Sequence, residues 1–278
     1  MEINVLLLGH NGGLGKAFKY LLKIKKIKCC VVKKEMVDFN NLKKIITQKK
    51  ISHIINCIAK TNLNYCEKNK INAYNANTKI PKIICMLIKK TKIKFIHFST
   101  EAVFLGTKKN TTYSEKDLPC PKTIYGITKF LAEKELLKQA NTLIIRLPYL
   151  FGETHNKQIF SKLFKNFVKK KKIYVANDVF STPVYSPDLC SFVYENCLKK
   201  NKYFDKKLIH YTSKKNMSLY DFVKKIVKSK FKKANLKLIH PIQDSEFKNS
   251  IKNKPKYLGL TSIYPELIYS PSYKKVKL

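Results

Sequence analysis

The sequence predicts an α/β protein, a doubly wound parallel sheet with a smaller, interleaved C-terminal α/β lobe. Three observations indicate this class. Short apolar runs alternate with helix-spaced apolar residues, a glycine-rich turn follows the first run, and 278 residues are enough chain for a large core. Such alternation requires right-handed crossovers that cover both faces of a parallel sheet. We expect one domain over residues 1–150 and the smaller lobe over residues 151–278.

The expected elements follow from the spacing of apolar residues. In the first half, apolar runs predict strands at 2–8, 28–32, 52–58, 94–99 and 142–147. Helical spacing predicts helices from the glycine turn to 22, from about 41, over 66–90 and over 125–139. In the second half, we expect helices at about 158–170, 187–199 and 218–230, and short strands at 172–175 and 207–211. Residues 241–273 are expected to be rich in loops.

The charge of the chain is strongly positive, because 57 Lys and Arg residues oppose 18 Asp and Glu and give a formal charge of +39. Arg146 is the only arginine, and the lysines are spread along the chain. Proteins that read nucleic acid rely on arginine forks and gather their charge on one face. We therefore interpret the lysines as solvated surface residues that attract anions weakly, and we expect no specific nucleic-acid partner.

Cysteine and histidine spacing favours neither a disulfide framework nor a metal site. The 8 cysteines contain no CxxC pair, and the 6 histidines show no HxxxH or HExxH spacing. Buried free thiols fit a reducing cytoplasm. Apolar runs stay well short of the ~18–20 residues that a bilayer span needs, and the N-terminus lacks the basic region of a signal peptide. We expect a cytoplasmic protein without a membrane anchor.

A glycine-rich segment, Gly9-His-Asn-Gly-Gly-Leu-Gly15, follows the first expected strand and opens the first helix. Glycines let the backbone turn tightly and approach a pyrophosphate, which then lies at the helix N-terminus. The spacing GxxGxxG differs from the commoner GxGxxG and in isolation could mark only a tight turn. Its place between strand and helix predicts a Rossmann-type, dinucleotide-binding domain over residues 1–150 and assigns the substrate to the smaller lobe.

A second group of residues can exchange a proton with a substrate. Tyr125 and Lys129 lie one helical turn apart, and Thr100 stands at the end of the fourth expected strand. A lysine ammonium, aided by an oxidised nicotinamide, lowers the pKa of a phenol toward the working pH, and a nearby hydroxyl orients the same substrate oxygen. YxxxK is a frequent chance pattern in a chain with 16 tyrosines and so many lysines. The prediction therefore depends on its order after the glycine segment and the strand end.

Eight segments resemble, in order, the motifs of one enzyme family. They are GHNGGLG (9–15), VDFN (37–40), INCIAKT with Glu67 (55–67), FSTEAVF (98–104), YSEKD before YGITK (113–129), RLPYLFG (146–152), DVFSTP (178–183) and KPKYLGL (254–260). The chain resembles the extended short-chain dehydrogenase/reductases, and within them the sugar-nucleotide reductases of the dTDP-4-dehydrorhamnose reductase family. The resemblance covers nearly the whole chain.

The resemblance implies roles for individual residues. The implied catalytic residues are Thr100, Tyr125 and Lys129. The implied cofactor-binding residues are Gly9, Asn11, Gly12, Gly13, Leu14, Gly15, Asp38, Phe39, Ile58, Ala59 and Thr61, with Tyr125 and Lys129. The implied substrate-binding residues are Thr100, Glu101, Tyr149 and Lys254. The family uses NADPH or NADH, and Lys33 and Lys34 could pair with a 2′-phosphate, which mildly favours NADPH.

Several positions on the substrate side depart from the family pattern. They are Asn64, Ala102, Tyr149, Lys254 and Leu258. A lysine in place of an arginine at a diphosphate keeps the charge but loses the bidentate geometry. These departures leave the expected reductase residues in place, but they bear on which sugar and which base the chain takes.

The leading hypothesis is an NAD(P)H-dependent reductase of a nucleotide-linked 4-keto-6-deoxy sugar, in deoxysugar and polysaccharide precursor synthesis. NADPH would deliver the hydride, Tyr125 the proton, and Lys129 would bind the ribose and lower the pKa of Tyr125. One alternative is an epimerase or dehydratase of the same superfamily, since the carboxylate of Glu101 follows Thr100. Another is a non-catalytic regulatory subunit that binds a sugar nucleotide. Relatives often dimerise, so a homodimer is a further expectation.

Overall fold

The computed structural model describes residues 2–109, 111–152, 159–231, 234–248, 250–251 and 254–273. Its centre is a 6-stranded parallel sheet in the order β10-β5-β4-β3-β1-β2. The strands are β1 (Asn4–Leu8), β2 (Lys28–Val31), β3 (His53–Asn56), β4 (Lys94–Thr100), β5 (Thr142–Leu147) and β10 (Leu208–His210). The predicted parallel α/β sheet is confirmed.

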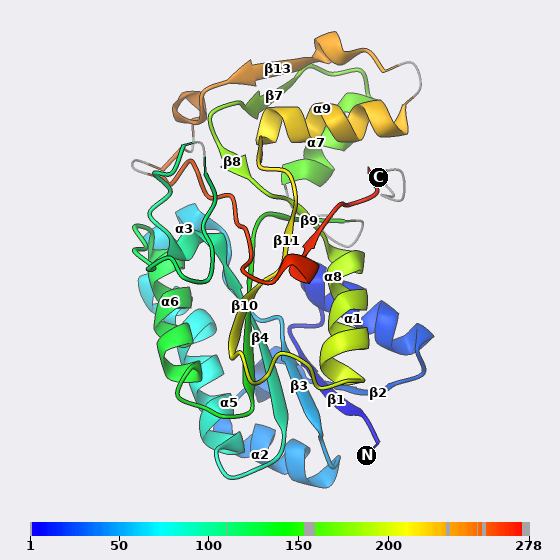
Figure 1. Cartoon of the computed structure of the whole chain (residues 1–278), viewed down its shortest axis with the longest axis vertical. Coiled ribbons are helices and arrows are strands. Elements are labelled where there is room, and N and C mark those ends of the chain that lie inside the picture. The colour runs from blue at the N-terminus through cyan, green and yellow to red at the C-terminus, as the bar shows by residue number, and fades with distance from the viewer. Residues whose placement is uncertain are drawn as a thin grey trace.

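Helices cover both faces of the sheet (Figure 1). On one face are α1 (Gly13–Ile24) and α8 (Ser186–Phe192), which continues as the π-helical η4 (Val193–Leu198); on the other are α2 (Phe39–Gln48), α5 (Ile80–Ile88) and α6 (Ile124–Leu136). The side chains of β1 alternate between these two layers. Val5 and Leu7 join the apolar cluster that contains α1 and α8, whereas Leu6 and Leu8 join the cluster that contains α2, α5 and α6. A strand buried on both faces needs such an uninterrupted apolar run.

The long helix expected over 66–90 is divided into pieces, so its continuity was wrongly predicted. The pieces are α3 (Leu63–Lys68), α4 (Lys70–Tyr74), the π-helical η2 (Asn75–Lys79) and α5. Asn69, between α3 and α4, has φ −129° and ψ 61°, which no α-helical residue adopts. The N–H of Tyr65 donates to the side chain of Asn62, which starts α3 earlier than expected.

A smaller lobe lies beyond the carboxyl ends of the sheet strands, at the top of Figure 1. Its elements are α7 (Ile159–Val168), β7 (Ile173–Ala176), β8 (Phe180–Ser181), β12 (Met217–Ser218), α9 (Leu219–Lys230) and β13 (Ile239–Ile242). β7 pairs with β13 in parallel, and β8 pairs with β12 in antiparallel fashion. Phe151, Phe167 and Phe222 lie in the apolar core that these elements enclose.

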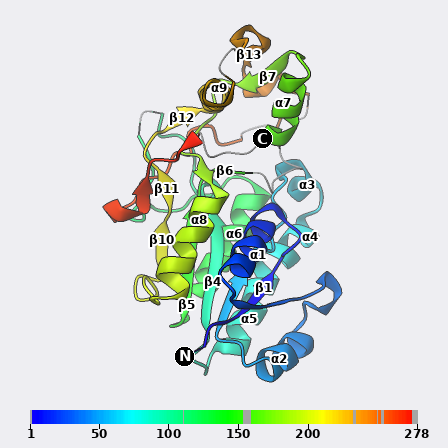
Figure 2. The ribbon, with the colours of Figure 1, turned by 90° about the vertical axis from the view of Figure 1, so that its right-hand side faces the viewer.

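The chain passes between the two parts of the molecule more than once (Figure 2). β9 (Val184–Tyr185), α8, β10 and β11 (Thr212–Ser213) lie between β8 and β12 in sequence. Of these, α8 covers the main sheet and β10 pairs with β5 at its edge. The strand expected over 207–211 therefore extends the sheet that is built by the first half of the chain.

The remaining elements are short. They are β6 (Leu150–Phe151), β14 (Ile268–Tyr269), η1 (Lys34–Met36), η3 (Glu101–Val103), η5 (Leu236–Leu238), η6 (Asp244–Glu246) and η7 (Pro265–Leu267). The region expected to be rich in loops thus carries the end of β13, two 3₁₀ turns and β14. None of the helices in the described ranges combines the length and the apolar character that a membrane crossing requires.

Candidate active site

The order of the sheet reverses next to β1, since β2 lies on one side of β1 and β3 and β4 follow on the other. In open α/β sheets, ligands bind beyond the carboxyl ends of the strands at this switch point. The glycine segment after β1 meets the segment after β3 there, because a Cβ added to Gly9 would lie 2.7 Å from backbone atoms of Cys57 and Ile58. The fold thus brings together two segments that the sequence analysis assigned to the cofactor.

The glycine segment forms a tight turn that ends in an uncapped helix. Gly9 has a φ of +77°, and its carbonyl accepts a 3.0 Å hydrogen bond from the N–H of Gly12. A Cβ on Gly15 would lie only 2.1 Å from the Gly9 oxygen, so only glycine lets α1 begin here. Gly12 is the N-cap of α1 and has no side chain to bind the first-turn N–H groups. These donors fit a pyrophosphate.

The acidic segment beside the second strand has a structural role of its own. Asp38 is the N-cap of α2, and its carboxylate accepts hydrogen bonds from Asn41 N at 2.9 Å and Asn41 Nδ2 at 2.6 Å. The hydrogen bond from the Asn41 backbone, followed by that from its side chain, lowers the pKa of Asp38. Phe39 opens α2 and is exposed, as is Lys33, whereas the side chain of Lys34 lies outside the described residues.

The segment after β3 is held by its own side chains. Ile58 and Ala59 are half-buried, and Thr61 is exposed. The N–H of Ile58 donates to Asn56 Oδ1 at 3.0 Å, which turns the chain at the end of β3. These residues lie on the path that the resemblance assigned to the cofactor, next to the glycine turn.

Asn77 links this segment to the helix that carries Tyr125 and Lys129. Its side chain lies in η2, accepts from Lys60 N at 2.8 Å and donates to Lys60 O at 3.1 Å. It also donates to Thr128 Oγ1 on α6 at 3.0 Å. Asn77 was not singled out from the sequence, although a polar residue inside an apolar helical pattern was an available signal.

Thr100 and Tyr125 meet at the end of β4. The two side chains are close enough for the Thr100 hydroxyl to lower the pKa of Tyr125, and Thr100 Oγ1 accepts from Ala102 N at 3.2 Å. Tyr125 stands in the first turn of α6, whose N–H of Ile124 donates to the carboxylate of Glu67 at 2.8 Å. Burial raises the pKa of Tyr125 to about 12, and the nearby Thr100 hydroxyl opposes that rise. Two hydroxyls therefore lie next to each other at the end of β4.

Lys129 is buried one turn further along α6, with 1% of its surface exposed. Its amine contacts His97 Nε2 at 3.0 Å and donates to the carbonyl of Phe98 at 2.5 Å. Burial lowers the pKa of Lys129 to about 7, against the opposing effects of Glu133 and Cys57. The expected lowering of the Tyr125 pKa by Lys129 involves the bound nicotinamide as well and stays a prediction.

Glu101 follows Thr100 and points into the interior. Ser181 Oγ donates to Glu101 Oε2 at 2.8 Å and accepts from Tyr149 N at 3.2 Å. Burial raises the pKa of Glu101 well above its usual range, and the carboxyl in turn raises the pKa of Tyr125 and, after burial, of Tyr149. The structure thus brings Glu101 and Tyr149 together with Tyr125. Ser181 was not singled out from the sequence.

Residues 3–264 match the family described as RmlD substrate binding domain. The chain belongs to this family. A spore coat polysaccharide biosynthesis protein of Bacillus subtilis (strain 168), SpsK, is 28% identical over 199 residues, 68% of each chain. A dTDP-4-dehydrorhamnose reductase of Aggregatibacter actinomycetemcomitans is 28% identical over 193 residues, which are 67% of this chain and 65% of that protein. The predicted resemblance is confirmed.

The RmlD-family fold extends over the whole described chain. The crystal structure of a dTDP-4-dehydrorhamnose reductase from Bacillus anthracis str. Ames, in complex with NADP, matches with a TM-score of 0.87 and 22% identity. The match covers 99% of this chain and 97% of that one. At this identity the likeness shows the fold alone.

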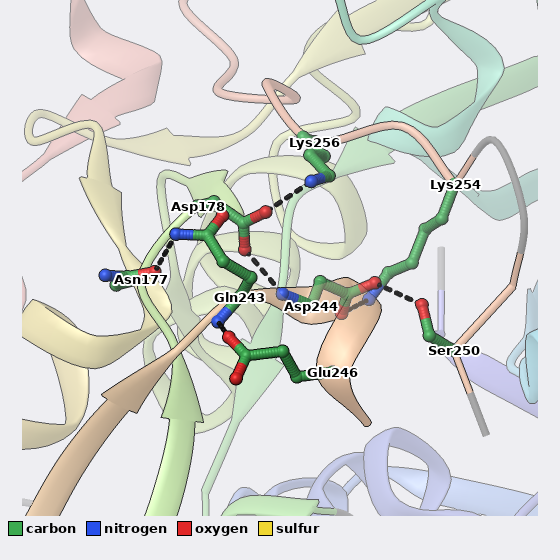
Figure 3. Close-up of polar contacts among 8 residues, drawn as sticks. All are labelled: Asn177, Asp178, Gln243, Asp244, Glu246, Ser250, Lys254 and Lys256. Carbon is green, nitrogen blue, oxygen red and sulfur yellow. Dashed lines mark hydrogen bonds and ion pairs between the residues drawn. The ribbon is translucent and has the colours of Figure 1, made fainter. Parts of the chain in front are cut away.

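Lys254 of this RmlD-family chain is already paired with a carboxylate (Figure 3). Its amine lies 2.7 Å from Asp244 Oδ1, and Asp244 Oδ2 accepts from Ser250 Oγ at 3.0 Å. Lys256 forms a second ion pair with Asp178, whose other oxygen accepts from Asp244 N at 2.8 Å. Lys254, which was expected to bind a substrate diphosphate, is thus held by a residue of the smaller lobe. The contact described for its amine is with Asp244, and not with Thr100 or the other catalytic candidates.

Metal ligands do not gather in the part of the RmlD-family chain that the structure describes. No three His, Cys, Asp or Glu side chains of the described residues lie together in a way that could hold a metal ion.

Proposed function

We propose that the chain is an NADPH-dependent reductase of a nucleotide-linked 4-keto-6-deoxy sugar, of the dTDP-4-dehydrorhamnose reductase kind. The observation that carries the proposal is the proximity of the Thr100 hydroxyl to the Tyr125 phenol beyond the carboxyl end of β4, in a sheet whose order reverses next to β1. Family membership supports it, as do the relative named dTDP-4-dehydrorhamnose reductase and the reductase of the same fold in complex with NADP.

The glycine segment is the proposed site of the cofactor pyrophosphate. The uncapped first turn of α1 offers N–H donors and the positive end of the helix dipole. When bound, NADPH supplies the hydride. Gly9 to Gly15, Ile58 and Ala59 would line its path, and the exposed Lys33 would face a 2′-phosphate.

The proposed chemistry on the protein side is proton donation to a developing alkoxide. Thr100 orients the carbonyl oxygen of the sugar, and Tyr125 donates its phenolic proton to that oxygen as negative charge grows on it. The raised pKa of about 12 keeps Tyr125 protonated at neutral pH, which is the state that reduction needs. Glu101 and Tyr149 would contact the sugar beside them.

The test is NADPH oxidation with a dTDP-linked 4-keto-6-deoxy sugar, with Tyr125→Phe compared against Tyr211→Phe. Tyr211 is a buried tyrosine that stacks on Phe192 and serves as the matched control. We expect Tyr125→Phe to lose ~100-fold or more in kcat with an unchanged Kd for NADPH. Tyr211→Phe should stay near wild type. Turnover of Tyr125→Phe at the wild-type rate would overturn the assignment.

The same assay separates the alternative functions. Turnover without net consumption of NADPH, supported by bound NAD⁺ alone, would identify an epimerase or dehydratase. Binding of NADPH and sugar nucleotide without turnover on any nucleotide-linked 4-keto sugar would identify a non-catalytic subunit.

We also propose that the protein is a cytoplasmic homodimer. The support is general, since relatives of this kind often dimerise and the free cysteines fit a reducing compartment. Light scattering of the purified protein and fractionation of cells test the two statements separately.

A further inference from the structure

Three buried polar side chains form a hydrogen-bonded row next to the candidate active site. Asn56 ends β3, His97 is its cross-strand neighbour on β4, and Lys129 reaches them from α6. Their exposed fractions are 1%, 0% and 1%, so water cannot satisfy their polar atoms. Asn56 Nδ2 lies 3.2 Å from His97 Nδ1, and His97 Nε2 lies 3.0 Å from Lys129 Nζ.

The backbone fixes the direction of the hydrogen bonds in this row of three side chains. The N–H of Ile58 is a donor only, and it lies 3.0 Å from one end of the Asn56 amide, so that end is the oxygen. The NH₂ end of Asn56 therefore faces His97 Nδ1, which must accept. A neutral imidazole that accepts at Nδ1 carries its proton at Nε2. That N–H then points at the amine of Lys129.

An N–H donor facing a lysine selects the neutral amine. An ammonium has three donors and no acceptor, whereas the neutral amine has one lone pair that can accept from His97 Nε2–H. It still donates to the carbonyl of Phe98. We propose that Asn56 fixes the tautomer of His97, and that His97 thereby holds Lys129 as the neutral amine and acts as its positioning residue.

The surrounding groups are consistent with this assignment. Lys129 is faced by His97 from β4, by the thiol of Cys57 after β3, and by Glu133 on its own helix. Glu133 is already engaged in a bidentate pair with Arg146, at 2.9 Å and 2.7 Å. Burial lowers the pKa of His97 well below its usual range, so the imidazole is neutral as the proposal requires.

The consequence for turnover rests on the proposed function. Each reduction takes the phenolic proton of Tyr125 as the O–H bond breaks and a C–O–H forms, and the phenolate must regain a proton from solvent. Lys129 can pass that proton on only in its ammonium form. Since the resting site favours the neutral amine, kcat should fall as the pH rises above the pKa of Lys129, which is about 7.

The tautomer can be measured without any assay of activity. The protein is labelled with ¹⁵N-histidine, and two-bond ¹H–¹⁵N correlation spectra distinguish the two tautomers of each of the 6 histidines. The signals of His97 are those missing from His97→Gln. The proposal requires a proton on Nε2 at neutral pH, and a proton on Nδ1 would overturn it. The tautomer can be measured even if the protein reduces no sugar nucleotide. The proposal for His97 can therefore fail while the proposed function holds, and the reverse is also possible.

Asn56→Asp is a substitution of nearly the same size that should change the tautomer of His97. Its carboxylate still accepts from the N–H of Ile58 but offers a second acceptor in place of the NH₂ donor, so the His97 proton must move to Nδ1. His97 Nε2 then accepts from an ammonium at Lys129. We expect the spectrum to show the Nδ1–H form and the alkaline limb of kcat against pH to move up by about one unit or more. An unchanged alkaline limb, in a variant whose tautomer has switched, would overturn the link to Lys129.

The new negative charge needs a control of its own. Asn56→Asp combined with His97→Phe keeps the carboxylate but removes the imidazole that transmits its effect. The alkaline limb of this double variant should return toward that of His97→Phe alone. If it stays shifted as in Asn56→Asp, a through-space charge effect is responsible and the role of His97 is refuted.

Discussion

Ser181 donates a 2.8 Å hydrogen bond to the carboxyl group of Glu101, 80 residues away in sequence. Ser181 belongs to β8 of the smaller lobe, whereas Glu101 follows the central strand β4, so this bond joins the two parts of the molecule at the candidate site. The carboxyl is 8% exposed, and burial raises its pKa well above the usual range. Burial therefore favours the protonated, neutral form of Glu101, which can both donate and accept.

The first prediction concerns that neutral acid. Glu101→Gln keeps the shape and the neutrality of the group, so kcat/KM should stay within about threefold of wild type. Glu101→Ala leaves Ser181 without its acceptor and should lower kcat/KM by about 10-fold or more. Steady-state kinetics at pH 7 measure both. If Gln is as damaging as Ala, the enzyme needs an ionisable carboxyl, as an acid–base dehydratase would.

The second prediction separates two glycines of the pyrophosphate turn. A Cβ at Gly15 would collide with the Gly9 carbonyl at 2.1 Å, whereas a Cβ at Gly12 meets only that oxygen at 3.4 Å. Gly15→Ala should therefore displace the start of α1 and weaken NADPH binding by about 10-fold or more, and it should lower stability by about 1–3 kcal/mol. Gly12→Ala should keep wild-type stability. Titration with NADPH and thermal melts test the pair, and equal effects of the two variants would contradict the geometry.

The third prediction concerns the ion pair of Lys254 with Asp244, at 2.7 Å. If Lys254 serves a substrate diphosphate, it must leave this carboxylate to do so. Asp244→Asn removes the competitor, and since such partly exposed pairs contribute up to about 1 kcal/mol, KM for the sugar nucleotide should fall by up to about fivefold. Lys254→Ala should raise KM, and kcat should change little in either variant. Unchanged KM in both would place Lys254 outside the substrate site.

The sheet, the glycine turn and the approximate positions of Thr100 and Tyr125 could be predicted from the sequence. Strands buried on both faces are uninterrupted apolar runs, and the turn at Gly9 needs a residue that tolerates a φ of +77°. Such features are local. Apolar spacing could not locate the break at Asn69, because the break depends on backbone angles that an asparagine permits but does not require.

Long-range polar contacts were beyond the sequence. Lys129 was expected on the helical face of Tyr125, but its contact with His97, 32 residues away, could not be foreseen, because the two lie on elements that pack together only in the fold. Lys254 was expected to be available, and its partner Asp244 belongs to a 3₁₀ turn that no pattern indicated. The division of the chain at residue 150 and the roles of the site residues stay predictions.

The fourth prediction tests the buried pair of Arg146 with Glu133. Both side chains are nearly inaccessible, at 4% and 0% exposure, and the guanidinium makes two hydrogen bonds to the carboxylate. Arg146→Met strands a buried carboxylate and should lower the free energy of unfolding by about 3–5 kcal/mol. Arg146→Met with Glu133→Leu removes both charges and should recover most of that loss. Chemical denaturation measures both, and a double variant no more stable than the single one would show that packing dominates over the charges.

The fifth prediction concerns stability in mild acid. Burial is the main cause that lowers the pKa of three histidines: His53, His97 well below its usual range, and His210 to about 4. At pH values below about 6.5, which is the pKa of these histidines in the unfolded chain, they bind protons in the unfolded chain but stay neutral in the native protein. The stability that these groups contribute is present above pH 6.5 and is lost as the pH falls.

Glu101 works in the opposite direction. Because its pKa is raised, Glu101 keeps a proton in the native state that the unfolded chain releases above about pH 4.5. This group therefore makes the folded protein more stable as the pH falls. Three histidines outweigh one carboxyl, and the urea midpoint should be lower at pH 5 than at pH 7. Glu101→Gln removes the opposing group and should widen that difference by up to about 1.4 kcal/mol per pH unit. A midpoint that is equal at both pH values in wild type and variant would show that the buried histidines are protonated in the native state.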